Sequence, residues 1–162
     1  AKNVEVEAEL GKIGATDKIE TDNDESLYTD PAEAEEFVAR TGVDTLAVSI
    51  GTAHGVYPVK NPKIDLERLA QIRKRVSIPL VLHGGSGLPP ETVQAAITIP
   101  GGGVSKINIA TDLEQAFLGS LGCQRKTNRE IWQMDEKALA EAAEAVQRVV
   151  EDKITNFLLW KG

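Results

Sequence analysis

The sequence is poor in the residues that mark secreted, membrane-spanning or nucleic-acid-binding proteins. A single cysteine, Cys123, excludes an intrachain disulfide and fits a reducing cytoplasm. No apolar run approaches the length of a membrane-spanning helix, and the first residues do not resemble a signal peptide. Only 18 residues are basic against 25 acidic ones, and the net charge of −7 disfavours nucleic acid and anionic membranes as partners. We therefore expect a cytoplasmic globular protein.

The chain is large enough for one domain with a real core. Its 162 residues are 41% hydrophobic and 27% charged, which is ordinary for a globular protein. We expect residues 1–162 to form one domain, with 122–162 as a C-terminal helical extension within it. The first residue is not Met and a strand pattern begins almost at once, so we expect a piece of a longer protein.

Apolar strands alternate with amphipathic helices along the sequence. The predicted strands cover 3–10, 45–50, 80–82 and 104–109, and the predicted helices cover about 30–41, 65–76, 90–98, 113–121 and 134–153. Short connections predict parallel strands with right-handed crossovers, in a small open α/β sheet or half of a (β/α)8 barrel. We favour the half-barrel, because all four strand ends carry a polar residue. These residues are Glu9, His54, His83 and Asn108.

The two histidines of the chain each come directly before a glycine near the end of an apolar strand. Parallel neighbours lie about 4.8 Å apart, so two imidazoles at strand ends can converge on one ion. A catalytic zinc site takes about three protein ligands, and here Glu7 or Glu9 of the first strand is the further candidate. The alternative is that His54 and His83 are isolated polar residues, each hydrogen-bonded in place.

Glycine-rich turns follow the third and fourth strands. Gly84–Gly87 and the turn at 108–111 indicate a phosphate site, since backbone N–H groups and the Ser86 hydroxyl can approach an anion. Helix capping is the simpler explanation for Thr111. A cation beside a phosphate site suits aldol chemistry, because it polarises a ketone and stabilises the enediolate.

Four segments together resemble the class II, zinc-dependent ketose-bisphosphate aldolases, which act on fructose or tagatose 1,6-bisphosphate. The segments are Val6–Gly11, Gly51–Gly55, Leu82–Gly87 and Lys106–Thr111. The resemblance implies strands five to eight of a (β/α)8 barrel followed by C-terminal helices. It also implies a lyase of carbohydrate metabolism that cleaves a ketose bisphosphate reversibly to dihydroxyacetone phosphate and glyceraldehyde 3-phosphate, as in glycolysis.

The same resemblance implies roles for individual residues. His54 and His83 would be two of three zinc ligands, Glu9 would belong to a second metal position, and Asn108 would contact the enediolate region of the substrate. Dihydroxyacetone phosphate would contact Gly55, Gly84, Gly85, Ser86, Asn108, Ala110 and Thr111. The resemblance further implies a monovalent cation, Na⁺ or K⁺, near the histidines, and a homo-oligomer, either dimer or tetramer.

Three departures from the family pattern limit what the chain can do alone. The catalytic aspartate and third zinc histidine of the family form an adjacent Asp-His pair, and this sequence contains no such pair. The loop after the first strand offers Asp17, and next Glu20, as the proton-shuttling carboxylate. Pro58 stands where many members carry a phosphate-contacting lysine, which leaves Lys60 as a substitute. We therefore expect an isolated chain that is catalytically incomplete.

Three interpretations remain open from the sequence. The first is a zinc aldolase, and the second is another phosphate-binding barrel enzyme, such as an isomerase or epimerase. The third is a half-barrel that binds metal or phosphate without catalysis. The sequence leaves the choice between fructose and tagatose bisphosphate open.

Overall fold

The computed structural model describes residues 4–12, 14–15, 27–57 and 62–159. These residues divide into two compact units, 1–109 and 110–162. The first unit contains strands β1 (Glu7–Leu10), β2 (Gly14–Ala15), β3 (Thr45–Val48), β4 (Ala53–His54), β5 (Leu80–Leu82) and β6 (Val104–Ile107), and helices α1 (Pro31–Thr41), α2 (Leu66–Arg75) and α3 (Pro90–Thr98). The second contains helices α4 (Thr111–Ser120), α5 (Asn128–Trp132) and α6 (Glu136–Asp152), and a π-helical turn, η2 (Lys153–Phe157).

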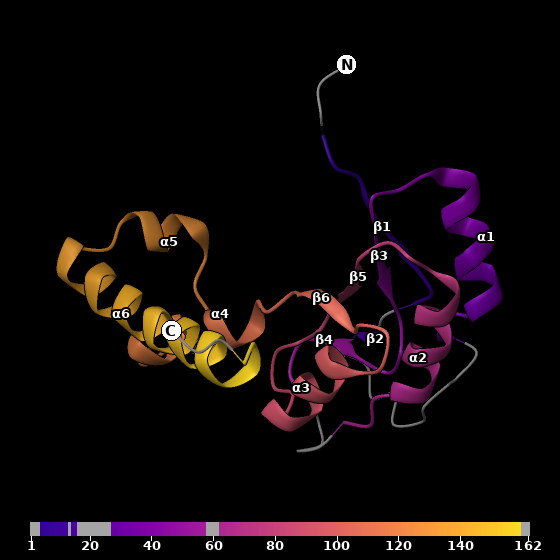
Figure 1. Ribbon diagram of the computed structural model, residues 1–162. Coiled ribbons are helices and arrows are strands. Elements are labelled where there is room, and N and C mark those ends of the chain that lie inside the picture. The colour runs from indigo at the N-terminus through magenta and orange to yellow at the C-terminus, as the bar shows by residue number, and fades with distance from the viewer. Residues whose placement is uncertain (1–3, 13, 16–26, 58–61, 160–162) are drawn as a thin grey trace. The chain divides into compact units, whose positions relative to one another are not determined.

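The main sheet of the first unit has four parallel strands in the order β1-β3-β5-β6 (Figure 1). Strands that follow one another in the chain are therefore neighbours in the sheet, with a helix in each connection. This is the strand order of a (β/α)8 barrel, and it confirms the expected parallel α/β architecture. All four strands point the same way, so their carboxyl ends lie at one edge of the sheet.

The helices of this unit begin and end where the sequence supplies capping residues. The Asp30 carboxylate accepts hydrogen bonds from the first-turn amides of α1, and Pro31 occupies the first helical position. Gly42 closes α1 with a left-handed φ of 65°. Asp65 caps α2 by accepting from the Arg68 amide. These caps fix the lengths of the crossovers between successive strands.

The strand register gives the sheet one wholly apolar face and a second face, here called the polar face, on which charged residues flank the buried Ala47 and Val81. Ala8, Leu46, Leu80 and Val104 lie opposite one another across the four strands. A second row contains the next residue of each of the first three strands, Glu9, Ala47 and Val81. Lys106 joins this row, two residues after Val104, because the register shifts between Leu80 and Val81. Because successive strand residues point to opposite faces, the first row faces the helices and the second faces away from them.

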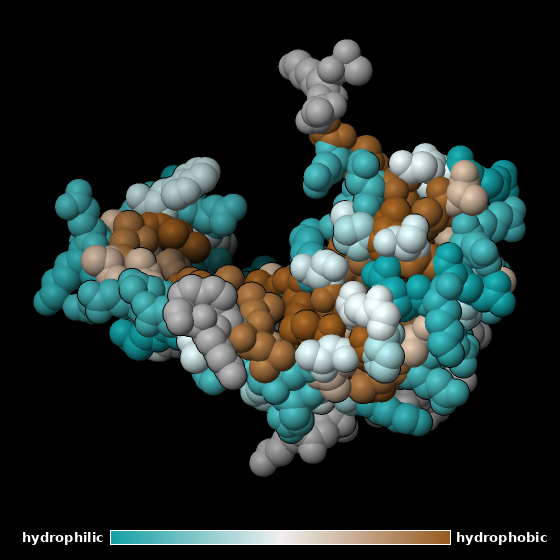
Figure 2. Space-filling view, in the orientation of Figure 1, coloured by the Kyte–Doolittle hydropathy of each residue, from teal (hydrophilic) through white to brown (hydrophobic). Residues whose placement is uncertain are grey.

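The core lies between the apolar face of the sheet and the three helices. Helix α1 packs beside α2, and α2 packs beside α3 (Figure 1). Fully buried residues come from both layers: Ala34, Leu46, Val48, Leu69, Ile72, Leu80, Leu82, Val93 and Ala96. The outward side of α1 is polar in the space-filling view (Figure 2). This core holds the strands in place, so the residues at their carboxyl ends are carried on a rigid layer.

The second unit is helical, and α4 packs along α6. Lys153 forms an ion pair of 2.6 Å with Asp112 of α4, and its ammonium group lies over the Phe157 ring. Phe157 is buried, whereas Ile154, Leu158 and Leu159 are partly exposed. Among the apolar residues of 154–159, Phe157 is therefore the one that this unit buries.

Several bounds differ from those predicted. Strands β1, β3 and β6 are shorter than expected, and α4 begins at Thr111 rather than near 113. The short β2–β4 pair and α5 are not predicted from the sequence, because segments of two to five residues carry no usable periodicity. No helix in the described part of the chain is long and apolar enough to cross a membrane.

Candidate functional site

The polar face of the sheet carries a connected cluster of Glu7, Glu9, His83 and Lys106. The Nδ1 atom of His83 lies 2.6 Å from Oε2 of Glu9, and Nε2 lies 3.2 Å from Oε1 of Glu7. The Lys106 ammonium group lies 2.8 Å from the other oxygen of Glu7. One imidazole is therefore held between two carboxylates, and one of those carboxylates is held by a cation.

The register explains how residues of β1 reach a histidine that follows β5, although β3 lies between these strands. Glu9 pairs with Ala47, and Ala47 pairs with Val81, which comes two residues before His83. Ala47 has only a methyl group, so the Glu7 and Glu9 side chains extend across β3 on the same face of the sheet. A larger side chain at position 47 would fill the space that these carboxylates use.

Glu7 is held in its charged form by its neighbours. The hydrogen bond from Lys106 is the largest cause that lowers the pKa of the Glu7 carboxyl, and the hydrogen bond with His83 adds to it. Partial burial acts in the opposite direction but does not outweigh them. The His83 side chain is 14% exposed and that of Glu7 is 29% exposed, so the cluster lies partly within the protein.

His54 lies beside this cluster. The ring centroids of His54 and His83 are 6.1 Å apart, and the ring planes are inclined by 32°. His54 belongs to β4, which pairs with β2 in parallel, so the segment after β3 is hydrogen-bonded to the segment after β1. The structure thus brings together the two histidines that the sequence analysis singled out.

The two imidazoles meet some of the requirements for binding one shared metal ion. Zinc–nitrogen bonds are about 2.0–2.1 Å long. Two rings whose centroids are 6.1 Å apart can therefore reach one ion by side-chain rotation. The Glu9 contact on Nδ1 of His83 matches the carboxylate that often supports a histidine ligand. Among the described residues, no group of three or more His, Cys, Asp and Glu side chains is arranged to hold a metal ion.

The glycine-rich segment after β5 passes close to two other segments of the first unit. A Cβ atom on Gly84 would lie 2.4 Å from the carbonyl oxygen of Ala53, and Gly84 has a left-handed φ of +68°. A Cβ atom on Gly85 would lie 2.5 Å from the Ile107 side chain. Only glycine allows both approaches.

Asn108 is fixed by its backbone. Its N–H donates to Leu82 and its carbonyl oxygen accepts from the Gly85 N–H, each at 2.9 Å. The Gly85 N–H is therefore used within the protein, where its hydrogen bond joins the segments after β5 and β6. Ser86 is buried in the same segment.

Tyr57 connects the segments that carry the two histidines. Its hydroxyl group accepts a hydrogen bond from the Ala53 N–H at 2.8 Å and donates one to the Gly84 carbonyl oxygen at 2.9 Å. Burial raises the pKa of this hydroxyl to about 12. Sequence reasoning missed both Tyr57 and Lys106. The available signal was a lysine within strand β6, between Ser105 and Ile107.

The remaining predicted residues lie next to His54, in the second unit or outside the described residues. Gly55 follows His54 and has a left-handed φ of 96°. Ala110 and Thr111 belong to the second unit, where the Ala110 carbonyl oxygen accepts from the first-turn amides of α4. Asp17, Glu20 and Lys60 fall in segments outside the described residues.

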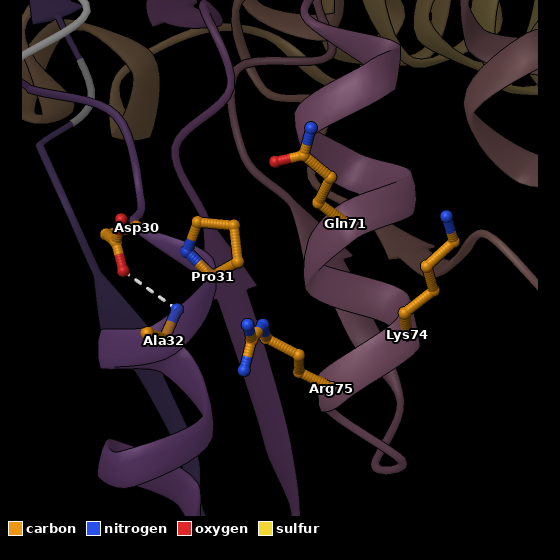
Figure 3. A pocket seen from close by; sticks show the side chains of 6 residues that line it. All are labelled: Asp30, Pro31, Ala32, Gln71, Lys74 and Arg75. Carbon is orange, nitrogen blue, oxygen red and sulfur yellow. Dashed lines mark hydrogen bonds between the residues drawn. The ribbon is translucent and has the colours of Figure 1, made fainter.

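A hollow of about 540 Å³ lies elsewhere, between α1 and α2. Its lining residues are Asp30, Pro31, Ala32, Gln71, Lys74 and Arg75 (Figure 3). The Asp30 carboxylate is occupied in capping α1, as the dashed line in Figure 3 shows. Arg75 forms an ion pair with Glu35. None of these residues was a predicted site residue, and the hollow is separate from the histidine cluster.

Comparisons with known proteins identify what the chain resembles. The family model for fructose-bisphosphate aldolase class II matches residues 1–159. The YdjI aldolase from Escherichia coli K12 is 38% identical, with a TM-score of 0.70, and the match covers 95% of this chain and 49% of that one.

Two further solved structures match in the same way. A protein assigned as a fructose-1,6-bisphosphate aldolase from Coccidioides immitis is 30% identical with a TM-score of 0.74, covering 95% of this chain and 52% of that one. The fructose-bisphosphate aldolase of Campylobacter jejuni is 26% identical with a TM-score of 0.66, covering 95% and 51%. The chain thus spans about half the length of these proteins, as expected for half of a barrel.

Proposed function

Because this chain belongs to the class II fructose-bisphosphate aldolase family, we propose that it supplies two zinc-binding histidines and a phosphate-binding loop to an aldolase. The proposed reaction is the reversible cleavage of a ketose 1,6-bisphosphate to dihydroxyacetone phosphate and glyceraldehyde 3-phosphate. The observation that carries this proposal is the pair of imidazoles, 6.1 Å apart, beside a glycine-rich segment at the carboxyl edge of a parallel sheet.

His54 and His83 are the proposed zinc ligands in this chain. Bound zinc would supply a Lewis acid for the ketone oxygen of the substrate. The Glu9 carboxylate at Nδ1 orients the His83 ring, fixes its tautomer and makes the other ring nitrogen a better ligand. Glu9 is also the candidate for a second metal position. For Nε2 of His83 to serve as ligand, Glu7 must release its 3.2 Å contact and remain with Lys106.

The glycine-rich segment is the proposed site for the substrate phosphate. The Ser86 hydroxyl and the loop backbone are the donors proposed for it, and Asn108 is proposed to contact the enediolate region. Gly55, Gly84, Gly85, Ala110 and Thr111 are the other substrate-binding positions that family membership suggests. A Na⁺ or K⁺ ion near the glycines is proposed on the same basis.

For catalysis the chain needs residues that its own sequence does not contain. Its 162 residues contain no Asp-His pair, so the third zinc ligand and the acid–base aspartate of this family must come from another segment or another subunit. Asp17 is the proposed proton-shuttling carboxylate of this chain. The proposed setting is a cytoplasmic homo-oligomer, a dimer or a tetramer.

Zinc titration tests the ligand assignment without the missing aspartate. We expect the protein to bind zinc in a calorimetric titration, and we expect His54→Ala and His83→Ala each to abolish that binding. Glu36→Ala, an exposed carboxylate on α1, is the matched control and should leave binding unchanged. Zinc binding that survives either histidine substitution would contradict the assignment.

The substrate is tested separately. An enzyme that carries both these residues and an Asp-His pair should cleave fructose or tagatose 1,6-bisphosphate, and Ser86→Ala should weaken phosphate binding more than it lowers turnover. If neither sugar is cleaved while zinc binds normally, the alternative of a non-catalytic half-barrel replaces the proposal.

A further inference from the structure

The hydroxyl group of Tyr57 joins the backbones next to both histidines. It accepts from the N–H of Ala53, the residue before His54, and donates to the carbonyl oxygen of Gly84, the residue after His83. With bond lengths of 2.8 and 2.9 Å, one oxygen atom connects the two backbones directly.

The surrounding contacts leave little room for these segments to move relative to each other. A Cβ atom on Gly84 would meet the Ala53 carbonyl oxygen at 2.4 Å, so the two backbones already touch. A Cβ atom on Gly87 would lie 3.4 Å from Cδ2 of Tyr57, so the ring also packs against the end of the loop. The Ala53–His54 segment is paired on β2 as well. Tyr57 thus occupies the junction of two fixed segments, 53–54 and 84–87.

We propose that Tyr57 is a positioning residue that sets the separation of His54 and His83 for metal binding. This inference rests on the proposed zinc function. The hydrogen bonds of the Tyr57 hydroxyl go to the backbones of Ala53 and Gly84, so it would act through these backbones rather than as a ligand. Metal ligands depend strongly on such supporting contacts, because a ligand that must be reoriented binds more weakly.

The chemistry of the position favours tyrosine over other residues. One atom of the side chain must accept one hydrogen bond and donate another. The side chain must also be long enough to place this atom between the two backbones, with an aromatic ring filling the space behind it. Burial keeps the phenol protonated, with a pKa of about 12, so the donor to Gly84 persists through the physiological range. Phenylalanine would keep the ring packing and lose both hydrogen bonds.

The test compares Tyr57→Phe with Thr29→Val. The Thr29 hydroxyl makes the same kind of bridge elsewhere: it donates to the Leu10 carbonyl oxygen at 2.6 Å and accepts from the Ser49 N–H at 2.8 Å. Both variants lose one bridging hydroxyl between strand ends, but only Tyr57 adjoins the histidines. We expect Tyr57→Phe to weaken zinc binding by about 10- to 100-fold, the usual effect of losing a supporting contact. Thr29→Val should change zinc affinity by less than about threefold.

A second measurement works whether or not the protein binds zinc. In the metal-free protein, Tyr57→Phe should speed hydrogen exchange of the Ala53 amide and shift the NMR signals of both histidine rings, and Thr29→Val should do neither. If the wild type does not bind zinc, its two histidines do not form a site without the third ligand, and the NMR comparison alone decides the role of Tyr57. Unchanged ring signals and an unchanged Ala53 exchange rate in Tyr57→Phe would overturn the inference. If the wild type binds zinc, an unchanged zinc affinity in Tyr57→Phe would overturn the inference as well.

Discussion

Replacing Gly84 by alanine tests the close approach of the two segments that carry the histidines. Two costs are expected at this position. The left-handed φ of +68° costs a residue with a Cβ atom about 1–2 kcal/mol. The new methyl group would also lie 2.4 Å from the Ala53 carbonyl oxygen, which is backbone and cannot rotate away. Overpacking of this kind adds about 1–3 kcal/mol.

Gly42→Ala provides a matched control in the same unit. Gly42 has nearly the same φ, +65°, but a Cβ atom there would have nothing within 4 Å. The control therefore carries the backbone cost of about 1–2 kcal/mol without the overlap. The difference between the two variants isolates the contact between Gly84 and Ala53.

Urea unfolding of the two variants measures this difference. We expect Gly84→Ala to lower the free energy of unfolding by at least about 1 kcal/mol more than Gly42→Ala does, within the range of overpacking costs. Equal losses in the two variants would refute the reasoning, because they would show that Ala53 and Gly84 are not in contact. The proposed site geometry would then lose its support.

Three further results are expected. Lys106→Met should lower the free energy of unfolding at neutral pH by about 0.2–1 kcal/mol, since the ion pair with Glu7 is partly exposed. Because Lys106 holds the pKa of Glu7 below its ordinary value, urea unfolding should show this loss fading as the pH falls through that lowered pKa. The raised pKa of Tyr57 should make the wild type lose stability between about pH 10 and about pH 12, a loss absent from Tyr57→Phe in thermal unfolding. Asp65→Ala should cost about 0.5–2 kcal/mol in urea unfolding, because it removes the cap of α2, whereas Asp65→Asn should recover most of it.

Much of the architecture could be predicted from local patterns. The helix α3 has its predicted bounds of 90–98, and α2 is capped by Asp65, where the sequence predicts a helix to begin. The parallel order of the main strands follows from the short connections between them, and the structure confirms it. These features depend on sequence neighbours, which is why they are visible without coordinates.

The contacts around His83 depend on strand register, which local patterns do not determine. Leu80 pairs with Val104, but the next residue, Val81, pairs with Lys106 because the register shifts between Leu80 and Val81. Simple alternation would place Lys106 on the same face as Val104, toward the helices. The irregularity brings it instead to the polar face, where it reaches Glu7.

The hydrogen bonds of Tyr57 could not be predicted from local sequence patterns either. Tyr57 follows His54 by only three residues, but its second contact, Gly84, is 27 residues away. Periodicity predicts which residues share a face of an element and says nothing about a turn that folds back on itself. The glycine at position 84 was predicted to serve an anion, and its close approach to Ala53 is a second reason for glycine there.

X-ray absorption at the zinc edge of the zinc-loaded protein tests the central claim most directly. Our account predicts that two imidazole nitrogens lie at about 2.0–2.1 Å from the zinc ion. It also predicts that one imidazole is lost in His54→Ala and one in His83→Ala. A spectrum without imidazole ligands, or one that either substitution leaves unchanged, would contradict the claim that these two histidines share an ion.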